Sequence, residues 1–245
     1  MIPCFNEAAR LKGDSLMELS ADPWRSVLFV NDGSRDHTGA LLDELQSHRP
    51  ESVEVVHLPR NVGKAEAVRV GLRRAFDSGA DLAGYFDADL ATPPAEMLRL
   101  FRLVEEGTGD FALASRVSLL GSQIERTPSR HYLGRLFASA ASVALAMRVY
   151  DTQCGAKVLR GTPIVREALK APFTTKWIFD VELMMRLLRG NSAGRLTASD
   201  FVEMPLACWE DVKGSKLSSR AMLGAAADLA RLAVSHRFSS RGSLR

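Results

Sequence analysis

Short apolar runs alternate along the chain with longer segments in which apolar residues recur every three or four positions. Buried strands are predicted for residues 27–30, 53–58, 82–86 and 111–114. Helical spacing covers residues 38–47 and 63–78, and Pro93 and Pro94 open a further helix, since proline is tolerated in the first turn. Because strands that alternate with helices form βαβ units, we predict an α/β fold with a mostly parallel sheet flanked by helices.

The first strand is expected to be incomplete. The chain opens with Ile2-Pro3-Cys4-Phe5, which has the character of a strand end without a strand body. A sheet of this kind needs a strand before that turn, so we predict that the first strand is truncated and that the native N-terminus lies upstream. No internal repeat or long linker is visible. We place one domain at residues 1–217, followed by a basic amphipathic helix and tail at residues 218–245.

Composition narrows the class of protein. The 245 residues are 46% hydrophobic, which is typical of a globular fold and excludes a disordered chain. The formal net charge is only +3 and no basic face is interleaved with aromatic residues, so we expect no nucleic-acid partner. The three cysteines show no disulfide or zinc spacing. The most apolar stretch, 136–147, is shorter than the ~20 residues that span a bilayer, and no signal peptide is visible.

An acidic pair, Asp87-Ala88-Asp89, follows the apolar run at residues 82–86. Side chains in a strand repeat with period two, so the two carboxylates point to the same side and repel each other. A hard divalent cation relieves this repulsion, because Mg²⁺ and Mn²⁺ favour carboxylate oxygen, and such a cation can also hold a diphosphate. Taken alone, the pair is more typical of aspartates that cap helices and fill turns, but the apolar run before it and Thr92-Pro93-Pro94 after it fix it at a strand tip.

Polar residues also follow the other predicted strands. Asp32, Arg60-Asn61 and Arg116 are expected at one edge of the sheet, because ligands of parallel sheets bind beyond the carboxyl ends of the strands. Asp32 can accept a hydrogen bond from a base or a ribose, although its surroundings also suit an ordinary βα turn. Lys64 opens a helix, where phosphate is favoured, but a solvated loop lysine is the alternative.

Two further groups of side chains suit a phosphate and a sugar. Arginine forks match phosphate oxygens, and four arginines follow the strand at 111–114, namely Arg116, Arg126, Arg130 and Arg135. Singly each is typical of a surface, but together they can bind an acceptor phosphate. Trp177 and Phe179 precede Asp180 and Glu182, a pattern that suits a pyranose, with rings on its faces and carboxylates on its hydroxyls. Core packing of the two rings is the alternative.

Taken together, these motifs resemble a known family. Four of them resemble, in their usual order, the family 2 glycosyltransferases of GT-A fold: Pro3-Cys4-Phe5-Asn6-Glu7, Asn31-Asp32-Gly33-Ser34, Arg60-Asn61-Val62-Gly63-Lys64 and Asp87-Ala88-Asp89. Further motifs are similar to the dolichyl-phosphate (polyprenyl-phosphate) β-glucosyltransferases: Ser115-Arg116, Asp151-Thr152-Gln153-Cys154-Gly155, Trp177-Ile178-Phe179-Asp180 and Gly214-Ser215-Lys216-Leu217. The departures are the missing first strand, Asn31 where the family usually has Asp, and Ala156 where an aromatic is common.

The resemblance implies a glycosyltransferase that moves glucose from UDP-glucose to a polyprenyl (dolichyl-type) monophosphate, with inversion and with Mg²⁺ or Mn²⁺. It implies that the nucleotide sugar is bound by Pro3, Phe5, Glu7, Asp32, Lys64, Asp87 and Trp177. Asp87 and Asp89 would hold the metal. Arg116 and Arg130 would hold the acceptor phosphate, and Asp180 would face the sugar, so that the catalytic residues are Asp89, Asp180, Arg116 and Arg130. The acceptor is already an anion, so no histidine base is required.

The lipid acceptor implies contact with a membrane. Residues 132–149 and 221–234 are amphipathic segments, and a basic end follows at residues 241–245. We therefore expect a cytoplasmic protein, peripheral on the cytoplasmic face of the membrane, although both helices can instead pack on the core and the second can form a dimer interface. Two other functions stay open, a polyprenyl-phosphate mannosyltransferase that uses GDP-mannose and a catalytically silent nucleotide-sugar-binding module.

Overall fold

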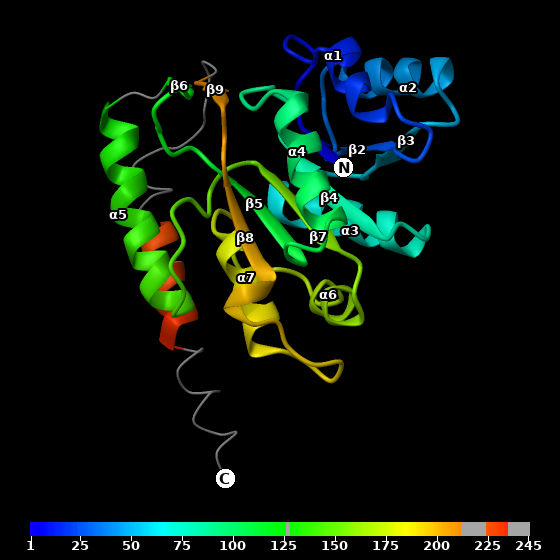
Figure 1. The fold of residues 1–245 in the computed structure, drawn as a ribbon. Helices are drawn as coiled ribbons and strands as arrows, with labels where there is room; N and C mark the ends of the chain where they lie inside the picture. The colour runs from blue at the N-terminus through cyan, green and yellow to red at the C-terminus, as the bar shows by residue number, and fades with distance from the viewer. Residues whose placement is uncertain (126–127, 212–223, 235–245) are drawn as a thin grey trace.

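A central sheet carries helices on both of its faces (Figure 1). The structure is a computed structural model, and it describes residues 1–125, 128–211 and 224–234, with residues 128–131 described as helix backbone only. The expected α/β architecture with a mostly parallel sheet flanked by helices is confirmed.

The strands form two neighbouring sheets and a small third one. The first sheet has the order β1 (Ile2–Cys4), β2 (Val27–Asn31) and β3 (Val53–His57), all parallel. The second has the order β4 (Leu82–Phe86), β7 (Ala156–Arg160), β5 (Phe111–Ser115) and β8 (Phe201–Pro205), in which β7 runs antiparallel to both neighbours. The third pairs β6 (Gln123–Glu125) with β9 (Cys208–Glu210). The Phe86 amide donates to the Met1 carbonyl over 3.1 Å, so β4 lies beside β1 and the first two sheets form one surface.

Helices pack on both faces of this surface (Figure 1). Their bounds are α1 (Gly13–Met17), α2 (Thr38–His48), α3 (Lys64–Asp77), α4 (Pro94–Glu105), α5 (Pro128–Leu145), α6 (Pro163–Ala168) and α7 (Phe179–Arg189), with single 3₁₀ turns at Glu18–Ser20 and Ala198–Asp200. In α3 the buried residues Val68, Leu72 and Phe76 recur every four positions, which is the spacing that turns one helix face to a core.

Two large apolar clusters on opposite faces of the sheet form most of the core, and a smaller one contains Leu28, Val30 and Ala67. Tyr85 belongs to the cluster under α3, α5 and α7, whereas its neighbour Phe86 belongs to the cluster under α4. Adjacent residues of a strand point to opposite faces, so a strand buried on both faces is apolar throughout, as β4 is. The acidic pair Asp87 and Asp89 accordingly follows the end of this strand.

The strands and helices predicted for residues 27–114 are all present within one or two residues of their expected bounds. The first strand, β1, pairs three residues with the last three of β2. Antiparallel β7 and the helix α7 were not predicted, because alternation of apolar residues encodes neither the direction of a strand nor the fold of the short motif around Asp180.

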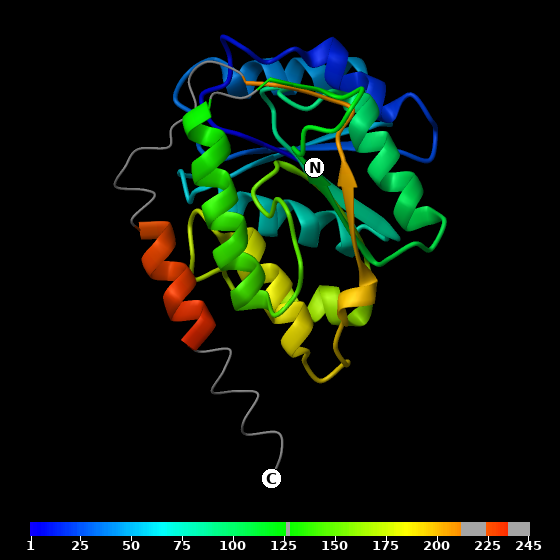
Figure 2. The ribbon, with the colours of Figure 1, turned by 60° about the vertical axis from the view of Figure 1, so that its left-hand side comes forward.

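A C-terminal helix at residues 224–234 lies beside α5 (Figures 1 and 2). Its residues Ala225 and Leu229 are buried in the same cluster as Ala141 and Leu145 of α5. The described part of the tail therefore packs on the domain. The motif at residues 214–217 and the basic end at residues 241–245 lie outside the described residues. Among the helices described, none combines the length and the apolar character needed to cross a membrane.

Candidate functional site

A cavity of about 640 Å³ lies at the carboxyl ends of β1, β2 and β3. It is lined by Phe5 and Asn6 after β1, by Asn31 and residues 33–35 after β2, and by residues 57–61 after β3. This is the edge at which parallel α/β sheets bind their ligands. The cavity is large enough for a nucleoside, and it presents both an aromatic ring and amide groups. Because its lining comes from the loops after β1, β2 and β3, these loops meet at one edge of the sheet, as the sequence predicted.

Asp32 fixes the wall of this cavity. Its carboxylate, 2% exposed, accepts hydrogen bonds from the Val62 amide at 2.7 Å, the Gly63 amide at 2.9 Å and the Asn61 side chain at 2.9 Å. Burial raises the pKa of Asp32, and these hydrogen bonds oppose the rise. At Gly33, with φ at +63°, a Cβ atom would come within 2.4 Å of the Arg60 carbonyl carbon, so the close approach of the two loops requires glycine. The contact of Asp32 with a nucleotide stays a prediction.

Glu7 is held from two sides in the loop after β1. Its amide donates to Thr38 Oγ1 over 2.8 Å, and its buried carboxylate accepts two hydrogen bonds from the Arg10 guanidinium. The hydrogen bond with Glu7 raises the pKa of Arg10, and the charges of Asp89 and Asp87 add to this rise. The positive charge of Arg10, which the sequence motifs did not single out, therefore acts on the acidic pair Asp87 and Asp89.

Lys64 and Asp87 meet where α3 begins and β4 ends. Lys64 Nζ lies 2.5 Å from Asp87 Oδ1, and both side chains are partly exposed. The Asp87 amide donates to the Gly155 carbonyl over 3.0 Å, and a Cβ atom at residue 155 would lie 1.9 Å from Asp87 Oδ2. Glycine at position 155 thus leaves the space that the Asp87 carboxylate occupies. This requirement explains one residue of the 151–155 motif.

Asp89 lies beyond Asp87 on a strained loop. Its Oδ1 accepts from the Ala91 amide over 3.1 Å, and Leu90 between them adopts φ of 55°, which is uncommon for a residue other than glycine. Burial raises the pKa of Asp89, and repulsion by the Asp87 carboxylate raises it further. A bound cation would relieve both effects, because it stabilises the ionised form of each carboxylate.

The acidic side chains at the end of β4 fit a hard cation that is bound by protein carboxylates and by a substrate together. Within residues 1–125, 128–211 and 224–234, no three His, Cys, Asp or Glu side chains converge as a metal site. Mg²⁺ is usually held by one or two carboxylates together with phosphate oxygens and water, and Asp87 and Asp89 supply such a pair of carboxylates. These residues thus fit Mg²⁺ or Mn²⁺ that a diphosphate helps to bind.

A buried ion pair lies behind this acidic pair. Asp180, at the start of α7, accepts a hydrogen bond from the Tyr85 hydroxyl, and its Oδ1 lies 2.7 Å from Lys157 Nζ. Lys157 is fully buried and also donates to the Cys154 carbonyl over 2.6 Å. Burial raises the pKa of Asp180 and lowers the pKa of Lys157, whereas their contact favours the charged form of each. Trp177, two residues before α7, is 43% exposed.

Glu182 has a structural task in the same helix. Its carboxylate accepts from the Thr174 amide at 3.0 Å and the Thr175 amide at 2.9 Å, and it lies 2.6 Å from Arg186. Although burial alone would raise the pKa of Glu182, these partners hold it below its usual value. The two acids of the 177–182 motif are therefore both buried with partners, Asp180 with Tyr85 and Lys157, and Glu182 with the turn before α7 and Arg186.

Arg116 is oriented by Asp151 across a loop. Nε and Nη2 of Arg116 donate to the two oxygens of Asp151 over 2.6 and 2.9 Å, and its guanidinium lies 5.3 Å from the centre of the Trp209 ring. Of the other arginines predicted to bind the acceptor, Arg135 stacks at 3.9 Å on Tyr150. The side chains of Arg126 and Arg130 lie outside the described residues, so their roles stay predictions.

The sequence offered one unused signal for Lys157. A lysine between Ala156 and the apolar residues Val158 and Leu159 indicates a buried charge that needs a partner. The partner, Asp180, is remote in the chain and becomes evident only in the folded protein. Arg10 gave no comparable signal, because basic residues are common after a strand.

Comparison with known proteins places the chain among sugar transferases. Residues 1–169 match the family described as glycosyl transferase family 2. A dolichyl-phosphate beta-glucosyltransferase of Trichomonas vaginalis is 28% identical over 253 residues, which cover 96% of this chain and 70% of that protein. A polyprenol monophosphomannose synthase of Mycolicibacterium smegmatis is 28% identical over 220 residues, which cover 89% of this chain and 80% of that protein.

A solved structure supports the fold. The glucosyl-3-phosphoglycerate synthase of Mycobacterium tuberculosis, in complex with Mn²⁺, UDP and glucosyl-3-phosphoglycerate, superposes with a TM-score of 0.62 at 17% identity. The match covers 96% of this chain and 77% of that one. The expected GT-A fold is thereby confirmed.

Proposed function

The chain belongs to glycosyl transferase family 2, and we propose that it transfers glucose from UDP-glucose to a polyprenyl monophosphate with inversion at the anomeric carbon. It is a glycosyltransferase, and its relatives indicate a polyprenyl phosphate as acceptor of a glucosyl or a mannosyl group. The observation that carries the proposal is the acidic pair Asp87 and Asp89, which lies with Lys64 at the sheet edge that also holds the 640 Å³ cavity.

The donor occupies that edge in this proposal. The uridine enters the cavity beside Phe5, with Pro3, Glu7 and Asp32 supporting its walls. The diphosphate lies at the N-terminus of α3, where unpaired amide groups favour an anion, and Lys64 contributes a positive charge. In the present geometry Lys64 contacts Asp87, so donor binding exchanges part of this ion pair for contacts with phosphate.

The chemistry follows from charge. Cleavage of the bond between glucose and UDP leaves negative charge on the β-phosphate, and Mg²⁺ or Mn²⁺ held by Asp87 and Asp89 would stabilise it. Arg116 holds the acceptor phosphate in line, and Arg130 is expected to assist. Asp180 faces the sugar as a fixed carboxylate, while Trp177 offers an exposed ring to a pyranose face. No proton needs to leave the acceptor phosphate, since it is an anion at neutral pH.

A panel of radiolabelled nucleotide sugars tests this function. The purified chain is incubated with polyprenyl phosphate and Mn²⁺, and the lipid product is extracted and counted. We expect product from UDP-glucose, and we expect Asp89→Ala to lower its formation at least about 100-fold, because a metal contributes several kcal/mol to the transition state. Asp81→Asn, at the exposed opposite end of the same strand, serves as control. Full activity of Asp89→Ala would refute the proposed site.

Two other outcomes identify other functions. The mycobacterial relative named as a phosphomannose synthase favours GDP-mannose as the second candidate donor, and lipid product from that donor alone would establish it. Binding of UDP without transfer to any lipid would instead identify a silent nucleotide-sugar-binding module.

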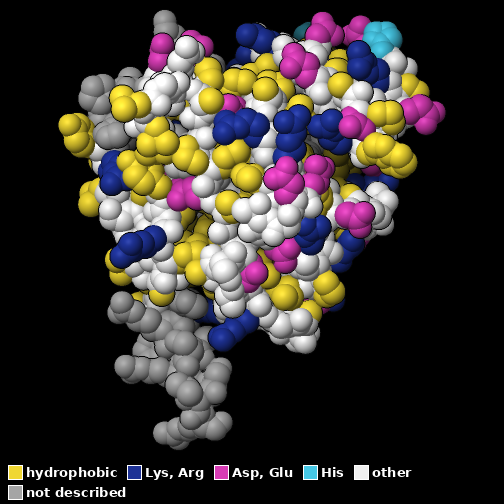
Figure 3. All heavy atoms as spheres, viewed as in Figure 1, with side chains coloured by type: hydrophobic (Ala, Val, Ile, Leu, Met, Phe, Trp, Pro, Cys, Tyr) yellow, Lys and Arg dark blue, Asp and Glu magenta, His cyan; other side chains and the backbone are white. Residues whose placement is uncertain are grey.

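We also propose that the protein associates peripherally with the cytoplasmic face of a membrane. The exposed side of α5 carries Tyr132, Leu136 and Val143, each 70% exposed or more, and apolar side chains gather over this flank (Figure 3). Apolar residues on an exposed helix face are typical of contact with a lipid surface. We expect the variant with serine at all three positions to float less with liposomes, whereas Trp24→Ser, at an apolar residue that is 94% exposed, should float as the wild type does. Equal flotation of both variants would exclude this face.

A further inference from the structure

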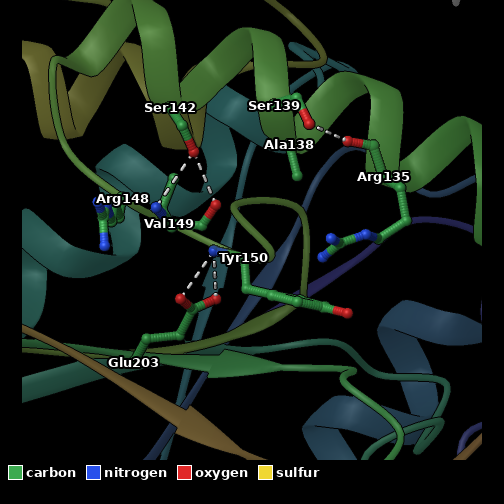
Figure 4. A pocket seen from close by; sticks show the side chains of 8 residues that line it. All are labelled: Arg135, Ala138, Ser139, Ser142, Arg148, Val149, Tyr150 and Glu203. Atoms are coloured by element: carbon green, nitrogen blue, oxygen red, sulfur yellow. Dashed lines mark hydrogen bonds between the residues drawn. The ribbon is translucent and has the colours of Figure 1, made fainter.

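Glu203 contacts the backbone amide of Asp151, the residue whose carboxylate holds Arg116. It projects from β8 into a cavity of about 470 Å³ that is also lined by Arg135, Arg148 and Tyr150 (Figure 4). The Glu203 carboxylate accepts hydrogen bonds from two successive backbone amides, Tyr150 at 2.7 Å and Asp151 at 2.6 Å. Within the part of the chain that the structure describes, Glu203 makes no ion pair, and these two amides are the main groups that stabilise its charge.

These contacts continue to Arg116. Asp151 receives the Glu203 contact through its amide, and with its carboxylate it accepts from the amide, Nε and Nη2 of Arg116. Arg116 directly follows β5, which pairs with β8 so that Leu113 lies opposite Glu203. The chain of contacts therefore starts on one strand, crosses the loop at residues 148–151 and returns to the neighbouring strand.

The loop at residues 148–151 is also held from α5. Ser142 of α5 donates to the Val149 carbonyl over 2.8 Å and accepts from the Val149 amide over 3.1 Å, and Arg135 stacks on the Tyr150 ring (Figure 4). Residues 148–151 lie between α5 and β7, and none of them pairs as a strand with any other described residue. Asp151 is held at its amide by the Glu203 carboxylate, and at its own carboxylate by Arg116 and by the Gln153 amide at 3.0 Å.

We propose that Glu203 is a positioning residue for the acceptor, which fixes Asp151 and through it the guanidinium of Arg116. The inference rests on the proposed function, in which Arg116 binds the acceptor phosphate. A carboxylate suits the task better than an amide would, because a carboxylate offers only acceptors to two converging N–H groups, whereas a glutamine presents one N–H₂ group among them. We expect loss of Glu203 to leave the donor side unchanged, since among the described residues its hydrogen bonds come from Tyr150 and Asp151 and not from α3 or the acidic pair.

The test is Glu203→Gln, an isosteric change that preserves packing. We expect the KM for polyprenyl phosphate to rise about 5- to 10-fold, while the KM for the nucleotide sugar and the Tm stay close to those of the wild type. Asp110→Asn is the matched control, because Asp110 lies just before the opposite end of β5 and pairs with Arg160 at 3.0 Å. Its acceptor KM should not change.

A double-variant cycle separates positioning from general stabilisation. If Glu203 acts through Arg116, then Glu203→Gln adds little to the loss already caused by Arg116→Lys. Losses that multiply, or a fall in Tm with an unchanged acceptor KM, would overturn the proposal and leave the proposed function standing. A wild-type chain that neither transfers to nor binds polyprenyl phosphate would overturn the proposed function itself, and this inference with it.

Discussion

Replacement of Lys157 by methionine tests the buried ion pair behind the acidic pair. Lys157 has no exposed surface, and the side chain of Asp180 is 8% exposed, so neither charge can be hydrated by bulk water. Methionine fills a similar volume but removes the contacts at 2.7 Å to Asp180 and at 2.6 Å to the Cys154 carbonyl. Asp180 then keeps the Tyr85 hydroxyl as its remaining close partner.

The expected cost is large for a single substitution. Removal of one partner of a buried pair typically costs about 3–5 kcal/mol, because the other charge is left uncompensated. Total stability of a domain is roughly 5–15 kcal/mol, so Lys157→Met should remove a substantial part of it. Lys170→Met removes a surface pair, 2.6 Å from Glu167 and 66% exposed on the lysine side, and is expected to cost no more than about 0.5 kcal/mol.

Equilibrium unfolding in urea at pH 7 measures both variants. The double variant Lys157→Met/Asp180→Asn should recover part of the loss, because it removes the stranded charge together with its partner. A loss below about 1 kcal/mol for Lys157→Met, with no recovery in the double variant, would refute the reasoning. It would mean that the pair is neutral in the folded state, with the proton on the carboxyl group, and that only a hydrogen bond is lost.

Three further outcomes are expected. Gly155→Ala should lower kcat/KM about 10-fold or more at fixed Mn²⁺, because the new Cβ atom would lie 1.9 Å from Asp87 Oδ2. Gly224→Ala, whose Cβ atom would have nothing within 4 Å, should leave kcat/KM unchanged. Equal kcat/KM values for the two variants would refute the predicted clash with Asp87. Burial alone would raise the pKa of Glu182, but hydrogen bonds from the turn before α7 and the charge of Arg186 lower it below its value in the unfolded chain. Ionised Glu182 therefore stabilises the fold at pH values above its unfolded pKa. This stabilisation is lost as the pH falls through the folded pKa. The difference in free energy of unfolding between wild type and Glu182→Gln should therefore shrink below pH of about 4, and a constant difference would contradict this assignment. Chelation by EDTA should abolish sugar transfer and added Mn²⁺ should restore it, and transfer that persists in EDTA would exclude a metal-dependent reaction.

The sequence by itself determined the secondary structure of the first half and the location of the site. Strand and helix periods are local properties, so Leu82–Phe86 and Lys64–Asp77 were predicted almost to their ends. Because parallel strands end at one edge, the residues that follow them were expected to gather there, and Asp87 indeed meets Lys64. The acidic pair was thus located from spacing and topology alone.

Tertiary structure decided the partners of the charged groups. Tyr85 and Asp180 are 95 positions apart, and Arg116 and Asp151 are 35 apart, so no local pattern indicates that these side chains meet. The antiparallel direction of β7 is of the same kind, since an apolar run looks the same in either direction. A buried charge takes whichever partner the fold brings within about 3 Å, and that choice is made by the packing of remote segments.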